Sequence, residues 1–265
     1  MRVKVDHQTF YEYDEPMHYA IERLYLTPRD EPGQRVISWE LTGSGDIRDQ
    51  LDAFGNVMST MVVTRPTQSM VIRVRGEVEC TPDTGMGAWV RSHLGRYEPP
   101  VEAFLRQTTL TTPNKDMSDF ARAHLGLPSR ESLLALARAI EGRIAYTPGV
   151  THVGSSAMDA WSRGAGVCQD HAHVMIAVCR SQNIPSRYVS GYLSGEARAS
   201  EATHAWVDVW IDGGWLAVDV THACEATDRW LRLAVGVDYD AAAPVRGVRR
   251  GGGQETMRVA VSVSH

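Results

Sequence analysis

The chain has 265 residues, of which 43% are hydrophobic and 22% charged, and its formal net charge is −5. This composition is typical of a folded globular protein, and the length allows one large domain or two smaller ones. The excess of acidic residues argues against nucleic acid as a partner.

Hydrophobic segments and cysteines indicate the compartment. No apolar stretch approaches the roughly 18 residues that a membrane span requires, and the first residues lack the apolar core of a signal peptide. The four cysteines, Cys80, Cys168, Cys179 and Cys224, show no short paired spacing. Together these features predict reduced thiols, no membrane partner and a cytoplasmic location.

The first 80 residues predict an antiparallel β domain. Apolar residues alternate with polar ones from Val3 to Tyr13, and again from Ile72 to Cys80. One buried face and one solvated face are usual in antiparallel sheets. Residues 52–56 predict a turn. We find no catalytic pattern here and expect a β-sandwich-like domain that supports a second domain, with substrate docking as the alternative role.

A domain boundary is predicted between residues 81 and 115, which are rich in proline, glycine and threonine. We therefore assign residues 1–105 to the N-terminal β domain and residues 106–265 to a second domain. Near the end of the chain, the glycine- and arginine-rich run 244–253 predicts a mobile loop, or alternatively a lid or rim over a groove. Apolar alternation over 256–263 then predicts a closing strand that can belong to either sheet.

Two helices and a loop are predicted before the central cysteine. Residues 118–124 and a longer segment capped by Ser129 or Ser132 have helical patterns. Residues 150–166 are polar and predict a long loop that leads to Cys168, a position where binding residues are common.

Cys168 is predicted to start a helix that packs into the core. Glycines precede it, and Val174, Ala177 and Val178 follow with the i, i+3, i+4 spacing of one buried helix face. The free N–H groups and dipole of a helix N-terminus favour a thiolate by about 0.3–1 kcal/mol. Lowering a cysteine pKa from about 8.5 to about 6 takes roughly 3.4 kcal/mol, so a second, cationic partner is required.

A predicted β-hairpin supplies this partner. Two β-rich segments flank an Asp-Gly-Gly turn at 212–214. Pairing of Trp210 with Trp215 sets the register, and Asp219 then becomes a diagonal neighbour of His204, about 7–8 Å away. The carboxylate can fix the imidazole tautomer while the other ring nitrogen faces the thiol. A slip of one residue would break this arrangement.

Several motifs follow one another in the chain, namely Gly166–Asp170, His173, Gly191-Tyr192, His204–Val207 and Asp219. As a set they closely resemble the transglutaminase-like cysteine protease superfamily, in its bacterial branch. The stretch Thr27–Arg35 also resembles the β domain that precedes the catalytic domain in this branch.

The resemblance implies an α+β fold, with an N-terminal antiparallel β domain followed by a papain/transglutaminase-like catalytic domain. In that domain a helix carrying the cysteine packs on an antiparallel sheet carrying the histidine and the aspartate. The resemblance also implies a catalytic triad, with Cys168 as nucleophile, His204 as general base and acid, and Asp219 as the group that orients the imidazole.

Two positions depart from the family pattern. Asp219 is followed by Val220 and Thr221, where Asp-Pro-Thr is usual. His171 stands where an aromatic residue is more common, and it lies on the same helix side as Cys168. His171 is therefore the alternative base, an assignment that activity lost in His171→Ala and retained in His204→Ala would support.

Acyl transfer is the chemistry that such a triad predicts, with attack of Cys168 on an amide carbonyl and a thioester intermediate. The Cys168 backbone N–H is the expected first oxyanion donor. Candidates for a second donor or a supporting residue are Gln169, His171, Asp159 and Trp161. Core packing is the alternative for Trp161.

A metal site is the competing interpretation, because His171, His173, His204 and His222 lie in the same part of the sequence. His171 and His173 are two apart, and such helix positions do not face each other. No calcium loop motif is present in the sequence. We therefore predict no metal and no cofactor, and expect His173 in the core or hydrogen-bonded behind the site.

Water is the default acceptor of a thioester in solution, so we predict hydrolysis by a cysteine protease or amidase. Transfer to an amine, as in transglutaminases, is the alternative, and a non-catalytic interaction module is the third interpretation. Peptides and other amides both fit as substrates. No pattern in the sequence indicates an oligomeric state.

Overall fold

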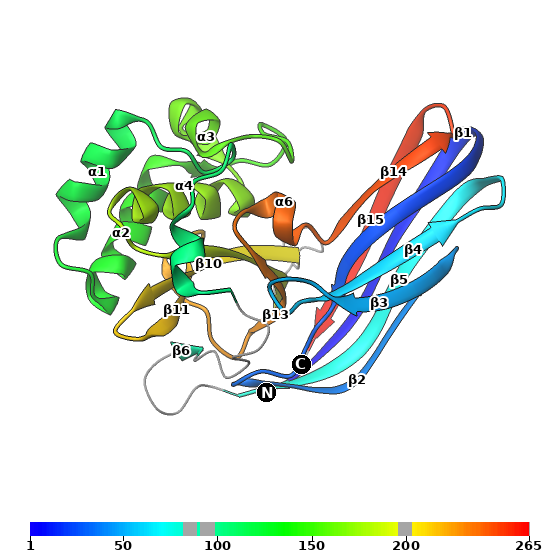
Figure 1. Cartoon of the computed structure of the whole chain (residues 1–265), viewed down its shortest axis with the longest axis horizontal. Helices are drawn as coiled ribbons and strands as arrows, with labels where there is room; N and C mark the ends of the chain where they lie inside the picture. Colours follow the sequence, from blue (N-terminus) through cyan, green and yellow to red (C-terminus); the bar gives the residue numbers. More distant parts are fainter. Residues whose placement is uncertain (82–88, 91–98, 196–202, 265) are drawn as a thin grey trace.

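The computed structural model describes residues 1–81, 89–90, 99–195 and 203–264. It has two parts, an N-terminal antiparallel sheet and a second antiparallel sheet covered by helices (Figure 1). This arrangement confirms the predicted α+β fold with an N-terminal antiparallel β domain. None of the helices in these residues is long and apolar enough to cross a membrane.

The N-terminal sheet has seven strands, which are β1 (Arg2–Thr27), β2 (Gln34–Gly43), β3 (Asp46–Leu51), β4 (Val57–Val63), β5 (Thr67–Cys80), β14 (Val245–Gly251) and β15 (Glu255–Ser264). The first half of β1 pairs with β5 and β15, and its second half pairs with β4 and β14. Between the halves the pairing is interrupted and the sheet folds over onto itself (Figure 1). The result is a sandwich-like domain.

One apolar core lies inside this folded sheet. Its members include Val5, Leu24, Met61 and Ile72, from β1, β4 and β5. Buried and less buried residues alternate along the first half of β1, as expected for a sheet with one face turned to the core.

The end of the chain returns to the N-terminal sheet. The predicted strand at 256–263 is confirmed as β15, and its sheet is now known, because it pairs with β1. The prediction of a mobile loop at 244–253 was wrong, since residues 245–251 form β14, whereas Pro244 at its start lies at the groove described below. Its side chains are mostly exposed and show no apolar alternation, so backbone pairing with β1 alone defines this strand.

The second sheet carries the order β12-β11-β10-β9-β13, with β6 paired to β11. Its strands are β6 (Trp89–Val90), β9 (Ser186–Leu193), β10 (Thr203–Ile211), β11 (Gly214–Asp219), β12 (Cys224–Glu225) and β13 (Trp230–Gly236). The hairpin register is confirmed, because Trp210 pairs with Trp215 across β10 and β11.

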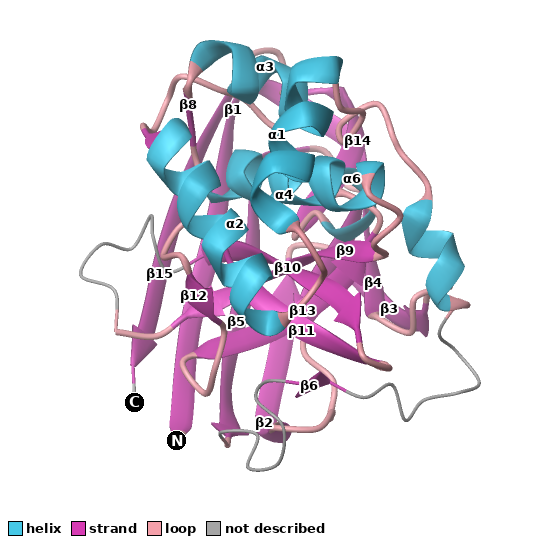
Figure 2. Cartoon of the chain, turned by 90° about the vertical axis from the view of Figure 1, so that its left-hand side faces the viewer, coloured by secondary structure: helices cyan, strands magenta, loops and turns pink. Residues whose placement is uncertain are grey.

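Helices cover one face of this sheet (Figure 2). They are α1 (Lys115–Leu125), α2 (Arg130–Arg143), α3 (Ala157–Arg163), α4 (Cys168–Ser181) and the short α6 (Tyr239–Ala242), with a 3-10 turn η1 at Val101–Leu105 and a two-residue parallel pair, β7 (Ala145–Tyr146) and β8 (Ala165–Gly166). Helix α4 packs on β10 and β9 and is surrounded by α1, α2 and α3. Its residues from Asp170 to Arg180 are all buried, so it is the central helix of this part.

Side-chain caps explain where the helices begin. Ser129 caps α2, as predicted, with Ser132 completing a capping box. Asn114 starts α1 earlier than predicted by accepting the Met117 N–H. The predicted loop 150–166 was wrong in part, because it contains α3. That helix has only seven residues, too few for a periodic apolar pattern to stand out.

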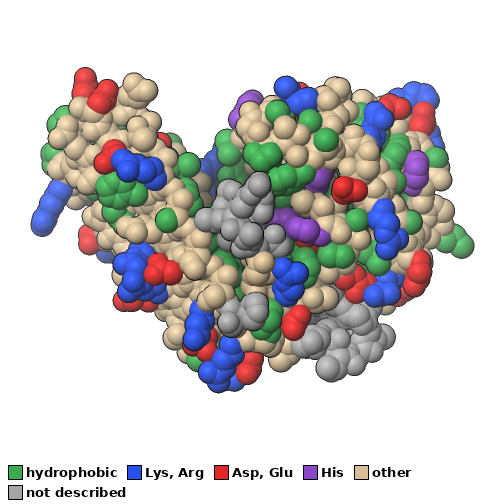
Figure 3. Space-filling view, turned by 180° about the vertical axis from the view of Figure 1, so that it is seen from behind, with side chains coloured by type: hydrophobic (Ala, Val, Ile, Leu, Met, Phe, Trp, Pro, Cys, Tyr) green, Lys and Arg blue, Asp and Glu red, His purple; other side chains and the backbone are tan. Residues whose placement is uncertain are grey.

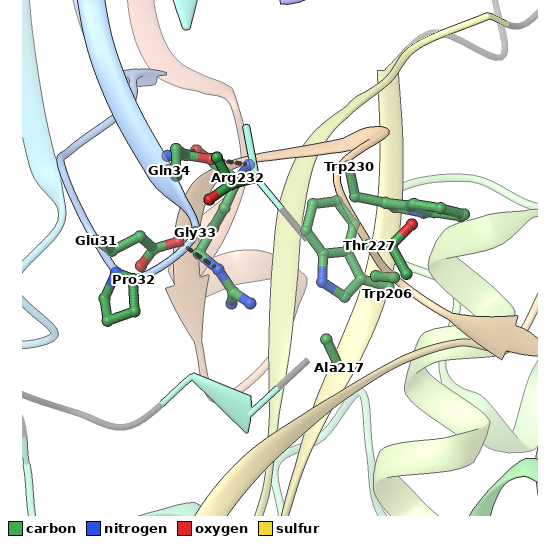
Figure 4. Close-up of a pocket in the computed structure, with 11 residues that line it drawn as sticks. Glu31, Pro32, Gly33, Gln34, Trp206, Ala217, Thr227, Trp230 and Arg232 are labelled. Carbon is green, nitrogen blue, oxygen red and sulfur yellow. Dashed lines mark hydrogen bonds and ion pairs between the residues drawn. The ribbon is translucent and has the colours of Figure 1, made fainter. Parts of the chain in front are cut away.

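The other face and the β13 edge of this sheet contact the N-terminal domain. The Gln34 carboxamide donates to the Arg232 carbonyl (3.0 Å) and accepts its N–H (2.8 Å). Asn56 holds the N–H and carbonyl of Val235 in the same way, at 2.8 Å each. Glu31 forms a 2.7 Å ion pair with Arg232, beside a small cavity of about 60 Å³ (Figure 4). Two carboxamides thus pair with the strand edge as another strand would.

Candidate active site

Cys168 is the first residue of α4 and is partly exposed. The residue before it, Val167, has no side-chain acceptor, so it leaves the N–H groups of the first helical turn uncapped. Asp170 instead accepts the Val167 N–H (2.8 Å) and the Thr151 hydroxyl (2.7 Å), which fixes the entry of the chain into the helix. A side chain at Gly166 would collide with the Asp170 carboxylate, since a Cβ there would lie 2.6 Å from it.

His204 on β10 connects the cysteine to a carboxylate. Its Nε2 lies 2.7 Å from Oδ2 of Asp219, which leaves Nδ1 for the Cys168 thiol. Burial alone would lower the pKa of His204, but the hydrogen bonds with Asp219 and Cys168 raise it to about 10. The imidazole of His204 is therefore favoured in its protonated form, and a positive charge is what a neighbouring thiolate requires.

Asp219 at the end of β11 accepts three side-chain donors on one oxygen. Besides His204, they are Nδ1 of His222 (2.7 Å) and Nε1 of Trp230 (2.9 Å), and the His222 N–H reaches the other oxygen at 3.2 Å. Burial opposes ionisation of this carboxyl, but the hydrogen bonds from His204 and His222 hold its pKa well below its usual range. Trp206 stacks beside His204, with ring centroids 6.4 Å apart.

Cys168 and His204 lie together in a groove of about 430 Å³. Aromatic, proline and small residues dominate its walls, which are formed by Tyr146, Pro148, Gly149, Thr151, His152, Val153, Val167, Gln169, Tyr188, Ser190, Thr203, Ala205, Tyr239 and Pro244. Figure 3 shows histidine side chains at the surface beside the hollow between the two parts of the molecule. Among the described residues, the walls carry no Asp, Glu, Lys or Arg.

His171 does not contact the thiol. Its Nδ1 lies 3.0 Å from the Thr221 hydroxyl and its Nε2 lies 2.9 Å from the Ile144 carbonyl. Burial lowers its pKa, so it is favoured as a neutral residue that ties α4 to its neighbours. The other helix histidine, His173, is fully buried, and burial lowers its pKa to about 3. Its Nε2 accepts the Tyr239 N–H at 3.2 Å, which places it in the core as expected.

Of the remaining candidates, Gln169 lies in the groove and Asp159 does not. Gln169 lines the groove next to Cys168, and its amide donates to the Val153 carbonyl at 3.0 Å. Asp159 does not line the groove; it completes the capping box of α3 with Ser156. Asp159 is therefore close to Cys168 in the sequence but is not part of the groove that contains it.

Trp161 also lies away from the groove and packs in the core, which was the alternative interpretation for this residue. Its Nε1 donates to Asp116 at 2.7 Å, and its ring stacks under the Arg143 guanidinium at 3.9 Å and against Phe120. It is 3% exposed, so no substrate could reach its face.

One group could hold a divalent cation, within the part of the chain that the structure describes. Its members are His204, Asp219 and His222, whose ligand atoms lie within 4.8 Å of one another. An ion would have to displace the protons of the two imidazole hydrogen bonds to Asp219, from His204 and His222. The group differs from the four histidines considered from sequence, since His171 and His173 are not part of it.

Two contacts of Asp219 were not predicted from the sequence, those with His222 and Trp230. His222 was considered only as a candidate metal ligand, although it lies three residues after Asp219, close enough for the carboxylate to bond the following turn. For Trp230 no local signal existed, since it reaches Asp219 from a different strand.

Comparison with known proteins gives a consistent family assignment. A model of the transglutaminase-like superfamily matches residues 120–220, and a model of the bacterial transglutaminase-like N-terminal region matches residues 3–79. An uncharacterised protein of Mycobacterium leprae is 30% identical over 99% of this chain and 98% of its own length. An uncharacterised protein of Mycobacterium tuberculosis is 29% identical over 93% of this chain and 87% of its own length.

Among solved structures, one from Cytophaga hutchinsonii named a "putative cysteine protease" has a TM-score of 0.79. It covers 99% of this chain and 90% of its own chain at 20% identity. The similarity therefore extends over both parts of the fold.

Proposed function

The chain belongs to the transglutaminase-like superfamily, and from that premise we propose that it is an enzyme that transfers an acyl group from an amide through a thioester on Cys168. The proposal rests on one observation above the others. His204 is hydrogen-bonded to Asp219 and lies in the same groove as Cys168, which begins a helix.

The first half of the reaction forms the thioester. The Cys168 thiolate attacks the amide carbonyl carbon, and the carbonyl oxygen gains the negative charge. The free N–H groups at the start of α4 stabilise this oxyanion. As the tetrahedral intermediate collapses, protonated His204 donates its proton to the departing amine, and the C–N bond breaks.

The second half regenerates the thiol. Neutral His204 removes a proton from water, the hydroxide equivalent attacks the thioester carbonyl, and the C–S bond breaks. The carboxylic acid leaves, and the imidazole is again protonated beside the thiolate. Asp219 stays ionised throughout and holds the ring so that Nδ1 faces the sulfur.

We favour water over an amine as the acyl acceptor. A lysine-like amine is an ammonium ion at neutral pH and requires a carboxylate nearby for binding. The described walls of the groove carry no Asp or Glu, whereas water requires no such partner. The same walls suit a neutral, largely apolar amide substrate such as a peptide.

We also propose a cytoplasmic location, which suits the free thiol that this chemistry needs. All four cysteines are unpaired in the structure. Fractionation of cells that express the chain would test this, and recovery outside the cytoplasm would contradict it.

A screen with labelled peptide amides tests the proposed reaction, run with and without an added primary amine. We expect release of free acid in both conditions and a Cys168 acyl adduct in mass spectra of quenched reactions. An amide product that forms only with the amine would assign transfer instead of hydrolysis. No adduct and no turnover across the screen would favour the non-catalytic interaction module.

A further inference from the structure

His222 lies in the turn that follows β11, and it holds Asp219 at two points. Its backbone N–H donates to Oδ1 of Asp219 at 3.2 Å, and its ring Nδ1 lies 2.7 Å from Oδ2. Both contacts span only three residues, so the turn itself orients the carboxylate. The bonds from His204 and Trp230 reach only Oδ2, so the His222 backbone N–H is the contact that holds the other carboxylate oxygen, Oδ1.

The ring of His222 is the exposed member of the group. Its side chain is 40% exposed, whereas that of Asp219 is 0% exposed and that of His204 is 4% exposed. The ring centroids of His222 and His204 lie 5.2 Å apart, and Trp230 completes the enclosure at 6.5 Å from His222. His222 therefore occupies the side on which the Asp219–His204 bond would otherwise meet water.

Two tryptophans cover the site where it adjoins the domain interface. Trp206 and Trp230 line the small cavity next to Arg232 and the loop that carries Glu31 (Figure 4). Trp206 stacks beside His204, and Trp230 donates to Asp219. His222 has the most exposed side chain of the triad's imidazole and carboxylate neighbours, so its substitution opens the site to water most directly.

We infer that His222 is a positioning residue of the reaction proposed above: it fixes Asp219 and shields the Asp219–His204 hydrogen bond from solvent. The inference rests on the proposed function, because it assigns His222 a role through the triad. A charge-assisted hydrogen bond is stronger where water is excluded, since the local dielectric constant is low. Opening this side therefore weakens the hold on His204 and, through it, the thiolate.

Other charged groups near the carboxylate are accounted for. His204 and His222 are hydrogen-bonded to Asp219, and His171 and Cys224 interact with its charge. His171 is engaged by the Thr221 hydroxyl and the Ile144 carbonyl. His204 contacts the thiol itself in the proposed reaction, so His222 is the group to vary.

The test compares three variants by the pH dependence of Cys168 alkylation with iodoacetamide. We expect His222→Ala to slow alkylation at neutral pH by about tenfold and to move the inflection to higher pH, the loss expected for one hydrogen bond to a charged group. His222→Asn keeps a short amide donor and should recover most of the rate. His18→Ala, which removes an exposed histidine of the N-terminal sheet, should match the wild type.

The outcomes distinguish this inference from the proposed function. An ordinary thiol profile in the wild type would contradict the proposed function itself. A wild-type profile that is reactive and unchanged in His222→Ala would overturn only the role of His222, as would an Asn variant no better than the Ala variant. Zinc retained by the purified wild type and lost in His222→Asn would assign His222 to a metal site instead. If His222→Ala does not fold, a substrate assay of His222→Asn tests the inference instead. We then expect His222→Asn to have a lower kcat than the wild type at an unchanged KM.

Discussion

Two buried aspartates on one β-hairpin have different partners. Asp208 on β10 and Asp219 on β11 are both 0% exposed. Asp208 is held by two guanidinium groups, Arg187 at 2.9 Å and Arg232 at 2.5 and 2.9 Å. Asp219 is held instead by two imidazoles and an indole, from His204, His222 and Trp230.

The partners, not the burial, distinguish Asp208 from Asp219, the carboxylate that we propose to be functional. Burial would raise the pKa of both aspartates, and in both the hydrogen-bonded partners lower it. A guanidinium stays protonated at every accessible pH, so the charges around Asp208 are permanent and brace the face that meets the N-terminal domain. An imidazole can lose its proton, and His204 faces a groove, so the same carboxylate can support proton transfer.

Replacing each aspartate by asparagine should separate the two roles most strongly. We expect Asp219→Asn to reduce kcat by about 10³–10⁴-fold with the fold retained, because the imidazole loses its orienting anion. Asp208→Asn should cost about 3–5 kcal/mol of unfolding free energy, because the buried guanidinium groups of Arg187 and Arg232 lose the carboxylate that they share, although Arg232 keeps its ion pair with Glu31. Steady-state kinetics and urea titration measure the two effects. Equal losses of activity in correctly folded samples of both variants would remove the distinction.

The two candidate bases, His204 and His171, give the next largest contrast. His204→Ala should abolish detectable turnover, whereas His171→Ala should lower kcat less than about tenfold and destabilise the fold by about 1–3 kcal/mol, the cost of buried groups left unpaired. The measurement is kcat together with thermal unfolding of each variant. Activity that survives in His204→Ala and disappears in His171→Ala would make His171 the base.

A smaller effect should appear in the pH dependence of stability, at the domain interface. His7 is buried between the Tyr192 hydroxyl (2.6 Å) and the Thr9 hydroxyl (3.0 Å), and burial lowers its pKa to about 4. The unfolded chain takes up a proton near pH 6.5, so this residue removes stability as pH falls from about 6.5 to about 4, by up to about 3 kcal/mol.

The matched variant is His7→Gln, which keeps a hydrogen-bonding side chain but cannot titrate. Its unfolding free energy, measured by urea titration at pH 7 and pH 4, should fall less than that of the wild type. The exposed-histidine variant His18→Ala serves as the control and should follow the wild type. Identical pH dependence in all three proteins would show that His7 does not contribute.

Much of the site could be predicted because its information is local in the sequence. The Asp-Gly-Gly turn with Trp210 and Trp215 on either side determined the hairpin register, and that register brought His204 and Asp219 together. The glycines before Cys168 indicated the start of α4. Each of these features depends on residues only a few positions apart.

The features that could not be predicted depend on distant partners. Strand β14 exists because its backbone pairs with β1, more than 200 residues away in the chain, and its exposed side chains carry no pattern. The support of Asp219 by Trp230 crosses from one strand to another. Asp159 was predicted to support the site because it is near Cys168 in the sequence, but its side chain instead caps α3.

The most direct test of the central claim is the pH profile of iodoacetamide alkylation at each cysteine, read by mass spectrometry. We predict that Cys168 is alkylated well below pH 8 and faster than the other three cysteines, and that His204→Ala abolishes this reactivity. Cys179 should stay unreactive, since burial raises its pKa to about 12, and so should Cys80 and Cys224, whose pKa values burial raises to about 11. An ordinary profile at Cys168, unchanged in His204→Ala, would contradict the account.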